Sequence, residues 1–286
     1  MNQTLAGKTI LFIGAGAMAE AIIRGLVSLP GSNPERIIAT NSSNRDRLTI
    51  LCQKYGIRTG SGPEAVRRYT AEADIIVLAM KPKDAGAALE DLAPLVHPGQ
   101  LVISVIAGLS IDTMENRLGR LIPIARCMPN TSCTIGMGAT GLCFSANASG
   151  VYQEMAINLF SATGETIVVE EPLIDIVTGV SGSGPAYIYT FMEALMEAGI
   201  QGGLNQEQAR KLTVQTVLGA ASMVKATGEE PASLRQKVTS PNGTTQAALE
   251  VLDQYHFQEA IRSAVRRASD RAGEIGRTIS EEMMKY

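Results

Sequence analysis

The sequence is poor in the residues that build several kinds of catalytic site. It has no tryptophan and only two histidines, His97 and His256, which excludes a histidine-rich metal site. A Ser-His-Asp triad would need one of those two histidines. The 4 cysteines form no Cys-x-x-Cys pair and are too few for a disulfide framework in 286 residues. We therefore expect no metal, reduced thiols and a cytoplasmic location.

Long apolar runs and a basic surplus are also missing. The longest apolar runs, residues 75–80 and 101–109, fall short of the ~18 residues of a membrane span and are typical of buried strands. Lys8 and the segments that follow it loosely resemble a signal peptide, but the apolar stretch, residues 9–13, is shorter than the roughly 7–15 residues expected. A net charge of −3 argues against nucleic-acid binding. We expect neither a membrane nor a nucleic acid as a partner.

The first 169 residues alternate between short apolar runs and segments of helical character. Strands are predicted at residues 8–13, 36–40, 74–80, 100–106, 121–127, 138–144 and 166–169. Helices are predicted between them, at residues 17–29, 43–55, 82–96, 111–118 and 149–162. Strands that alternate with helices of this length indicate βαβ units and a mainly parallel sheet. The pattern predicts an α/β domain over residues 1–169.

After residue 169 the pattern becomes all-helical. Helices are predicted at residues 172–180, 186–198, 206–226, 231–238, 244–254 and 257–285. We therefore place a second, all-α domain over residues 170–286. The helix at 186–198 is apolar around most of its circumference, and such a helix must be buried. Either a lone bundle or a dimer interface could bury it, and we favour the interface.

A glycine-rich segment follows the first predicted strand and opens the first predicted helix. Its residues, Gly14-Ala15-Gly16-Ala17-Met18-Ala19, match G-x-G-x-x-A, a variant of the dinucleotide fingerprint. Gly14 would permit the tight turn, Gly16 would let the backbone approach a pyrophosphate, and Ala19 would let the helix pack closely on the strand. The helix N-terminus would offer N–H groups to the phosphates. Because βαβ units follow, we predict a Rossmann-type dinucleotide-binding domain.

The residues after the second predicted strand indicate which dinucleotide is bound. An NAD-binding domain usually has a carboxylate there for the ribose hydroxyls. Glu35 precedes the strand and so lies at its wrong end, whereas Asn41, Ser42 and Arg45 follow it. A cation and neutral donors suit a 2′-phosphate, so we predict NADPH, with NADH as the alternative. Arg45 could equally be an ordinary solvated residue of the next helix.

Other motifs point to a second ligand. Ala79-Met80-Lys81-Pro82 ends a predicted strand, where ligands bind in open α/β sheets, although Lys81 could be a surface lysine. In the helical half, residues 178–187 and 239–246 each form a small-residue loop before a helix. Such loops offer backbone N–H groups to a carboxylate, although two plainly capped helices would look the same. Since no acid–base pair accompanies them, we favour hydride transfer to an imine.

Taken together, these motifs resemble the pyrroline-5-carboxylate reductase family over nearly the whole chain. The signature is the pair of segments 180–187 (Val-Ser-Gly-Ser-Gly-Pro-Ala-Tyr) and 238–245 (Val-Thr-Ser-Pro-Asn-Gly-Thr-Thr). The fingerprint, residues 79–82 and residues 126–131 (Arg-Cys-Met-Pro-Asn-Thr) support it. The resemblance implies reduction of 1-pyrroline-5-carboxylate to L-proline by NADPH, the last step of proline biosynthesis. It also implies a Rossmann domain and a helical domain that forms an interleaved homodimer, with dimers assembled into a ring.

The resemblance also implies roles for individual residues. The residues implied to contact the cofactor are Gly14, Ala15, Gly16, Ala17, Met18, Asn41, Ser42, Ala79, Lys81, Ala107 and Asn130. The residues implied to lie at the substrate are Glu171, Ser181, Gly182, Ser183, Gly243, Thr244 and Thr245. The segment from Ser181 would reach the pocket from the partner subunit, and N–H groups of Gly243–Thr245 would bind the substrate carboxylate. The Thr245 hydroxyl would orient the ring nitrogen and conduct a proton from solvent.

The chain departs from the family pattern at three positions. Asn242 stands where the family has glycine, Ser132 where it tends to have proline, and Lys237 where some members have a cofactor-contacting asparagine. Asparagine tolerates positive φ, so we expect the turn at Asn242 to be kept.

Two alternative functions stay open on the same scaffold. One is a reductase of another small cyclic imine or of a β-hydroxy acid, and the latter would need a catalytic lysine in the helical half. Lys211 and Lys225 lie there, but in no recognisable motif. The other is a non-catalytic NADPH-binding regulator, which would have lost the substrate loops that this chain retains.

Overall fold

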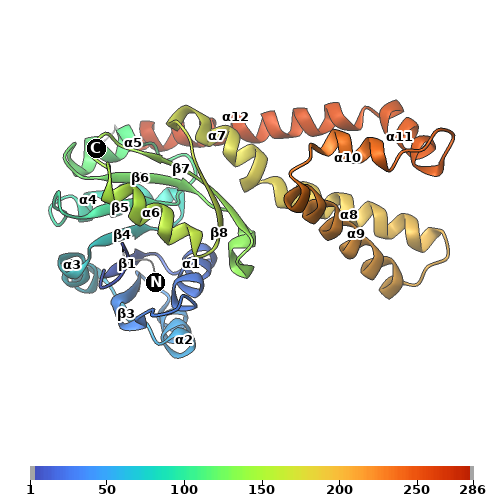
Figure 1. Cartoon of the computed structure of the whole chain (residues 1–286). Helices are drawn as coiled ribbons and strands as arrows, with labels where there is room; N and C mark the ends of the chain where they lie inside the picture. Colours follow the sequence, from blue (N-terminus) through green and yellow to red (C-terminus); the bar gives the residue numbers. More distant parts are fainter. Residues whose placement is uncertain (1–3, 284–286) are drawn as a thin grey trace. The chain divides into compact units, whose positions relative to one another are not determined.

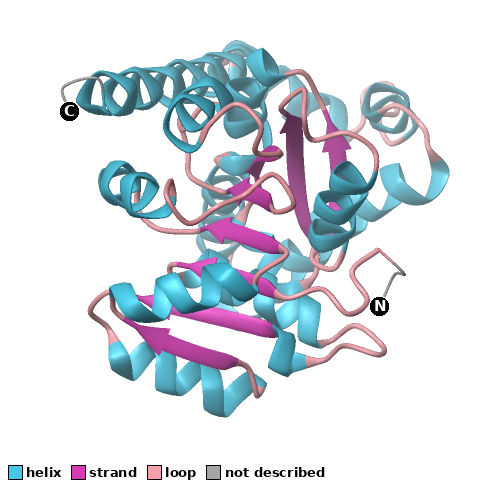
Figure 2. Ribbon diagram, turned by 90° about the vertical axis from the view of Figure 1, so that its left-hand side faces the viewer, coloured by secondary structure: helices cyan, strands magenta, loops and turns pink. Residues whose placement is uncertain are grey.

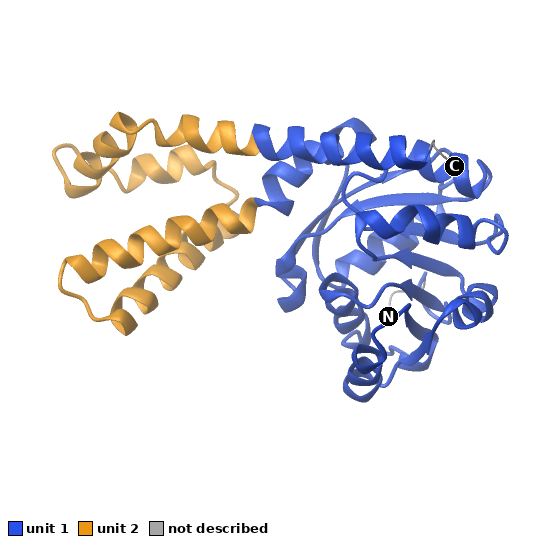
Figure 3. Ribbon diagram, turned by 180° about the vertical axis from the view of Figure 1, so that it is seen from behind, with its two compact units in different colours: residues 1–183, 266–286 blue, residues 184–265 orange. Residues whose placement is uncertain are grey.

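The computed structural model describes residues 4–283, which fall into two compact units (Figure 3). Unit 1 comprises residues 1–183 together with 266–286, and unit 2 comprises residues 184–265. Residues 170–183 and the end of the last helix thus pack with the α/β part of the chain. The boundary predicted at residue 169 marks the end of the strands, and we keep it as a proposal for the functional domains.

Unit 1 is built on one eight-stranded sheet (Figures 1 and 2). Its strands are β1 (Ile10–Ile13), β2 (Ile37–Asn41), β3 (Arg58–Ser61), β4 (Ile75–Leu78), β5 (Leu101–Ser104), β6 (Ile124–Met128), β7 (Gly138–Phe144) and β8 (Gly164–Val168). The order is β3-β2-β1-β4-β5-β6-β7-β8, and all pairs are parallel except β6 with β7. The first six strands have the dinucleotide-binding order, in which the order of strand addition reverses between β1 and β4. The predicted Rossmann-type fold is confirmed.

Helices cover both faces of this sheet (Figure 2). The α-helices of unit 1 are α1 (Ala17–Val27), α2 (Arg45–Tyr55), α3 (Pro63–Glu72), α4 (Ala85–Leu92), α5 (Ile111–Leu118), α6 (Val151–Ser161), α7 (Ile174–Val177) and the end of α12 (Phe257–Met283). On one face Phe12 packs in a core with residues of α1, α2 and α6. On the other face Leu11 packs with residues of α3, α4, α5 and α12. Because successive strand residues point to opposite faces, the strands are apolar on both sides, as a covered parallel sheet requires.

The sequence missed one β-strand and one helix. The segment Arg58–Ser61 forms the edge strand β3, and α3 follows it. Every residue of β3 is only half-buried, so the strand lacks the apolar run by which the inner strands were recognised. The helix predicted from Pro82 begins as a 3₁₀ turn, Pro82–Asp84, before α4.

Unit 2 is entirely helical, as predicted, within the part of the chain that the structure describes. It contains α8 (Gly184–Gln201), α9 (Gln206–Thr227), α10 (Pro231–Lys237), α11 (Thr244–Gln254) and the beginning of α12. Many of its large apolar side chains are exposed in the single chain, among them Ile188, Leu212 and Met223. None of the described helices is both long and apolar enough to cross a membrane.

Candidate functional site

The turn between β1 and α1 has the geometry that the fingerprint predicts. Gly14 has φ +108°, and its N–H donates to the carbonyl of Thr40 at 3.0 Å. A Cβ atom on Gly14 would lie 2.5 Å from the carbonyl oxygen of Ala79, whereas a Cβ on Gly16 would meet nothing within 4 Å. Gly16 is the N-cap of α1 and supplies no side-chain hydrogen bond. The backbone at the start of α1 is therefore open to an anionic ligand.

A charged cluster that the sequence did not predict supports this turn. The Arg47 guanidinium donates from Nε to the Ala15 carbonyl at 2.9 Å and forms an ion pair with Glu20. Lys54 and Tyr55 also donate to the Glu20 carboxylate, at 2.9 and 2.8 Å. Hydrogen bonds from Lys54, Tyr55 and Arg47 lower the pKa of Glu20 to about 2, although partial burial opposes the shift. The cluster ties α2 to the first turn of α1.

A groove of about 870 Å³ runs along the carboxyl ends of β1, β2 and β4. The predicted cofactor residues that line it are Gly14, Ala15, Gly16, Asn41, Ser42, Ala79 and Lys81. The predicted residues outside the lining are Ala17, Met18, Arg45, Ala107 and Asn130. Arg67 and Lys83 line the groove without having been predicted. This position, at the point where the strand order reverses, is where open α/β sheets bind ligands.

The loop after β2 is held by its own side chains. The Asn41 side-chain oxygen accepts the N–H groups of Ser43 and Asn44, both at 3.1 Å. Asn44 then caps α2 by accepting the N–H of Arg47 at 2.9 Å. The loop thus carries neutral polar groups and no carboxylate into the groove, as predicted from the sequence. Arg45 begins α2 with an exposed side chain.

Asn130 connects the end of β6 to the Ser181 segment. Its side-chain nitrogen donates to the Ser181 carbonyl at 3.1 Å, and its side-chain oxygen accepts the N–H groups of Ser132 and Ala139. The interpretation of residues 178–187 as a loop is wrong, because Thr178–Gly182 forms a π-helical turn between α7 and α8. Helical bonds, such as that from the Ser183 N–H to the Thr178 carbonyl at 2.8 Å, already use the backbone donors expected to be free there.

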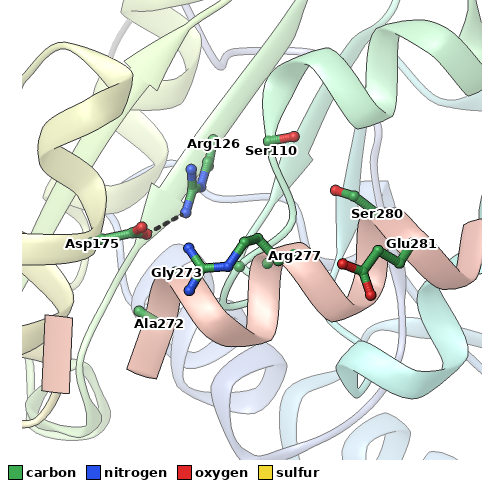
Figure 4. Close-up of a pocket in the computed structure, with 10 residues that line it drawn as sticks. Ser110, Arg126, Asp175, Ala272, Gly273, Arg277, Ser280 and Glu281 are labelled. Carbon is green, nitrogen blue, oxygen red and sulfur yellow. Dashed lines mark hydrogen bonds and ion pairs between the residues drawn. The ribbon is translucent and has the colours of Figure 1, made fainter. Parts of the chain in front are cut away.

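Arg126 lies at the centre of a second polar group, beside a cavity of about 320 Å³ (Figure 4). The Arg126 side chain is 8% exposed and pairs with Glu171 at 3.2 Å and with Asp175 at 2.9 Å. Glu171 also accepts the N–H of Ile111, the first residue of α5, at 2.8 Å. The carboxylate predicted to lie near the substrate therefore also binds β6 to the N-terminus of α5, where the helix dipole favours negative charge.

In unit 2, the predicted substrate motif forms the start of α11. Asn242 has φ +58°, so the expectation that asparagine keeps this turn is confirmed. A Cβ on Gly243 would lie 2.4 Å from the Ser240 hydroxyl oxygen, and α11 has no side-chain cap. The Gly243 N–H donates to the Ser240 carbonyl at 3.1 Å, so it is already used, contrary to prediction. The N–H groups of Thr244 and Thr245, in the first turn of α11, remain available for an anion.

Among residues 4–283, no group of three or more His, Cys, Asp or Glu side chains could hold a metal ion.

Family models match both parts of the chain. The model for pyrroline-5-carboxylate reductase dimerisation matches residues 171–275. A model described as NADP oxidoreductase, coenzyme F420-dependent, matches residues 9–108. The two matches cover the helical region that contains α11 and the strands that form the groove.

Relatives over the full length share the name of the first model. The chain is 41% identical over 274 residues to pyrroline-5-carboxylate reductase 1 of Bacillus spizizenii, covering 96% of this chain and 91% of the relative. It is 40% identical to pyrroline-5-carboxylate reductase of Pseudomonas aeruginosa, covering 95% and 98%. A solved pyrroline-5-carboxylate reductase from Coxiella burnetii superposes with a TM-score of 0.86 at 39% identity, covering 94% and 98%. The Plasmodium falciparum pyrroline carboxylate reductase, solved with NADP bound, superposes with a TM-score of 0.84 at 29% identity, covering 94% and 98%. The chain belongs to the pyrroline-5-carboxylate reductase family.

Proposed function

We propose that this protein reduces 1-pyrroline-5-carboxylate to L-proline with NADPH, the last step of proline biosynthesis. The observation that carries the proposal is the groove between β1 and β4, where the strand order reverses. The glycine turn after β1 leaves the backbone there open to a dinucleotide. The chain that forms this groove is 41% identical to a pyrroline-5-carboxylate reductase over 96% of its length. The relative from Plasmodium falciparum was solved with NADP.

The fit to NADPH rests on the shape and charge of the groove. Gly14 makes the turn, and the open backbone at Gly16 presents the uncapped N-terminus of α1 to the pyrophosphate. The β2 end carries Asn41 and Ser42 in place of the carboxylate that would repel a 2′-phosphate. Ala79 and Lys81 extend the lining beyond β4, and we assign Ala107 and Asn130 to the nicotinamide end. NADH remains the weaker alternative donor.

NADPH held in the groove would supply a hydride for C5 of the cyclic imine. The chain's own residues hold and orient the substrate. The first N–H groups of α11, those of Thr244 and Thr245, hold the substrate carboxylate, where the helix dipole favours negative charge. The Thr245 hydroxyl orients the ring nitrogen and passes it a proton from solvent, because a hydroxyl titrates too high to be the acid itself. We keep Glu171, Ser181, Gly182 and Ser183 as proposed substrate residues.

We extend the proposal to the assembly. The apolar side chains of Ile188, Leu212 and Met223 are 47%, 58% and 51% exposed in the single chain. Exposure on that scale favours a homodimer through unit 2, in which the Ser181 segment of one subunit approaches the pocket of the other. Assembly of dimers into a ring and a cytoplasmic location belong to the same proposal.

The test is a spectrophotometric assay of the purified protein with 1-pyrroline-5-carboxylate and either NADPH or NADH. We expect oxidation of NADPH with L-proline as the product, and slower oxidation of NADH. If NADPH binds tightly but is not oxidised, the proposed reaction is wrong. Trials of other cyclic imines would then separate a reductase with a different substrate from a non-catalytic regulator.

A further inference from the structure

The two ends of the groove carry different charges. The wall after β4 contains two lysines, Lys81 and Lys83, together with two carboxylates, Asp84 and Asp91. The opposite wall is formed by the loop after β2 and the beginning of α3, and its only charged residue in the lining is Arg67. A dianionic group is therefore favoured at the Arg67 end, where no lining carboxylate opposes it.

The sheet places Arg67 close to the loop that follows β2. β2 and β3 are neighbours, and Asn41 pairs with Ser61 at their carboxyl ends. The chain then continues as Ser42–Asn44 from one strand and as Gly62 and α3 from the other. Gly62 has φ +85° and is the N-cap of α3, so the helix starts immediately after the strand. Arg67, in the second turn of α3, lines the same groove as Ser42 and Ser43.

The other arginines near this loop either already have partners within the protein or lie outside the groove lining. Arg68 forms an ion pair with Glu72 at 3.4 Å and lies over the Tyr69 ring. Arg47 is held by Ala15 and Glu20. Arg45 is exposed and is not part of the groove lining. Arg67 has no ion pair or hydrogen bond to the described residues, so its guanidinium is available to a ligand.

We propose that Arg67 recognises the 2′-phosphate of NADPH and sets the preference for NADPH over NADH, in place of Arg45. The inference rests on the proposed function, since it takes NADPH as the ligand of the groove. A guanidinium binds phosphate through two parallel charge-assisted hydrogen bonds. Ser42 and Ser43 line the same groove, and their hydroxyl groups supply further donors. The 2′-hydroxyl of NADH offers no charge to Arg67, so that cofactor gains little from it.

The experiment measures dissociation constants of NADPH and NADH by fluorescence titration for the unmodified protein and for Arg67→Gln, Arg68→Gln and Arg45→Gln. We expect Arg67→Gln to weaken NADPH binding by roughly 10- to 100-fold, as for loss of a charge-assisted pair, and to change NADH binding by less than about 2-fold. Arg68→Gln is the matched control one position away, and both it and Arg45→Gln should leave NADPH binding within about 2-fold. Arg67→Lys should recover part of the loss, because it restores the charge without the planar fork.

A second titration isolates the phosphate itself. Adenosine 2′,5′-bisphosphate should protect the unmodified protein against thermal unfolding more strongly than adenosine 5′-monophosphate, and Arg67→Gln should remove the difference. Equal weakening of NADPH and NADH in Arg67→Gln, or a selective loss in Arg45→Gln instead, would overturn the inference. If the protein fails to reduce 1-pyrroline-5-carboxylate yet shows these binding differences, the proposed reaction is wrong and the inference about Arg67 is supported. If the reaction proceeds but the unmodified protein binds both cofactors equally, the inference about Arg67 is wrong and the proposed reaction is supported.

Discussion

A Cβ atom on Gly14 would come within 2.5 Å of the carbonyl oxygen of Ala79. The two residues follow the neighbouring parallel strands β1 and β4 at the point where the strand order reverses. Their backbones meet so closely that no side chain fits between them, and both residues line the groove.

Alanine substitutions at Gly14 and Gly16 should therefore separate folding from binding. Gly14→Ala combines the contact with Ala79 and a φ of +108°, so we expect a loss of about 2–4 kcal/mol in the free energy of unfolding. Gly16→Ala should leave stability unchanged, because its Cβ meets nothing within 4 Å, yet weaken NADPH binding by roughly 10-fold or more. Urea unfolding and fluorescence titration measure the two effects. Equal behaviour of the two variants would contradict this division.

The Glu20 cluster should make the free energy of unfolding depend on pH below about 4.5. Hydrogen bonds from Lys54, Tyr55 and Arg47 lower the pKa of Glu20 from 4.5 to about 2 in the folded protein. Because the pKa is lower in the folded protein than in the unfolded chain, the Glu20 carboxylate stabilises the fold fully above about pH 4.5. This contribution is lost as pH falls from about 4.5 towards 2.

Urea unfolding of Glu20→Gln at several pH values tests this dependence. We expect the variant to be less stable by about 1–2 kcal/mol at pH 7, with the difference shrinking as pH falls below about 4.5. Glu64→Gln, which removes an exposed carboxylate at the start of α3, is the control and should show no such trend. A difference between Glu20→Gln and the unmodified protein that stays constant with pH would contradict the interpretation.

Removing the buried Arg126 should cost far more than removing a surface arginine. The Arg126 side chain is 8% exposed and forms ion pairs with both Glu171 and Asp175, so Arg126→Met leaves two carboxylates without this partner. We expect a loss of about 3–5 kcal/mol in the free energy of unfolding. Arg58→Met breaks a pair with Glu72 that is about one-third exposed, and should cost under about 1 kcal/mol. Similar unfolding midpoints for the two variants would show that the Arg126 group contributes little.

Asn41→Asp should shift the cofactor preference without disturbing the loop. The Asn41 side-chain oxygen only accepts hydrogen bonds, from the N–H groups of Ser43 and Asn44, and a carboxylate can accept both. The added charge would repel a 2′-phosphate and suit the ribose hydroxyls of NADH. We expect NADPH binding to weaken by roughly 10-fold, with NADH binding unchanged or tighter. An unchanged ratio of the two dissociation constants would place the 2′-phosphate away from Asn41.

Thr245→Val should lower turnover more than Thr244→Val. Valine keeps the shape and the backbone N–H of threonine, so each variant loses only a hydroxyl. We expect kcat to fall by roughly 100-fold in Thr245→Val, with little change in KM for 1-pyrroline-5-carboxylate, because the hydroxyl acts on the proton and the N–H on the carboxylate. Thr244→Val, at a more exposed position, should keep near-normal turnover. Near-normal turnover in Thr245→Val would remove its assigned role.

Most of the sheet could be predicted because buried parallel strands are continuous apolar runs. β1, β4 and β5 are of this kind, and β7 was predicted with its observed bounds. β3 escaped prediction because an edge strand buries less, and Arg58 and Ser61 are only half-buried there. The segment at Ser181 was misread for a different reason. Its glycines and serines are typical of loops, but helical bonds to α7 and the contact with Asn130 hold it as a π-turn.

Features of this protein that depend on neighbouring residues could be predicted from the sequence. Gly14 adopts its positive φ, Asn242 keeps its turn and the loop after β2 carries no carboxylate, because each depends on residues within a few positions. Contacts between groups far apart in the sequence depend on how the chain folds. The fold brings Arg47 to Ala15 and Glu20, Arg126 to Glu171 and Asp175, and Arg67 rather than Arg45 to the groove. Spacing along the chain carries no information about such contacts, because strand order and helix packing set the distances between them.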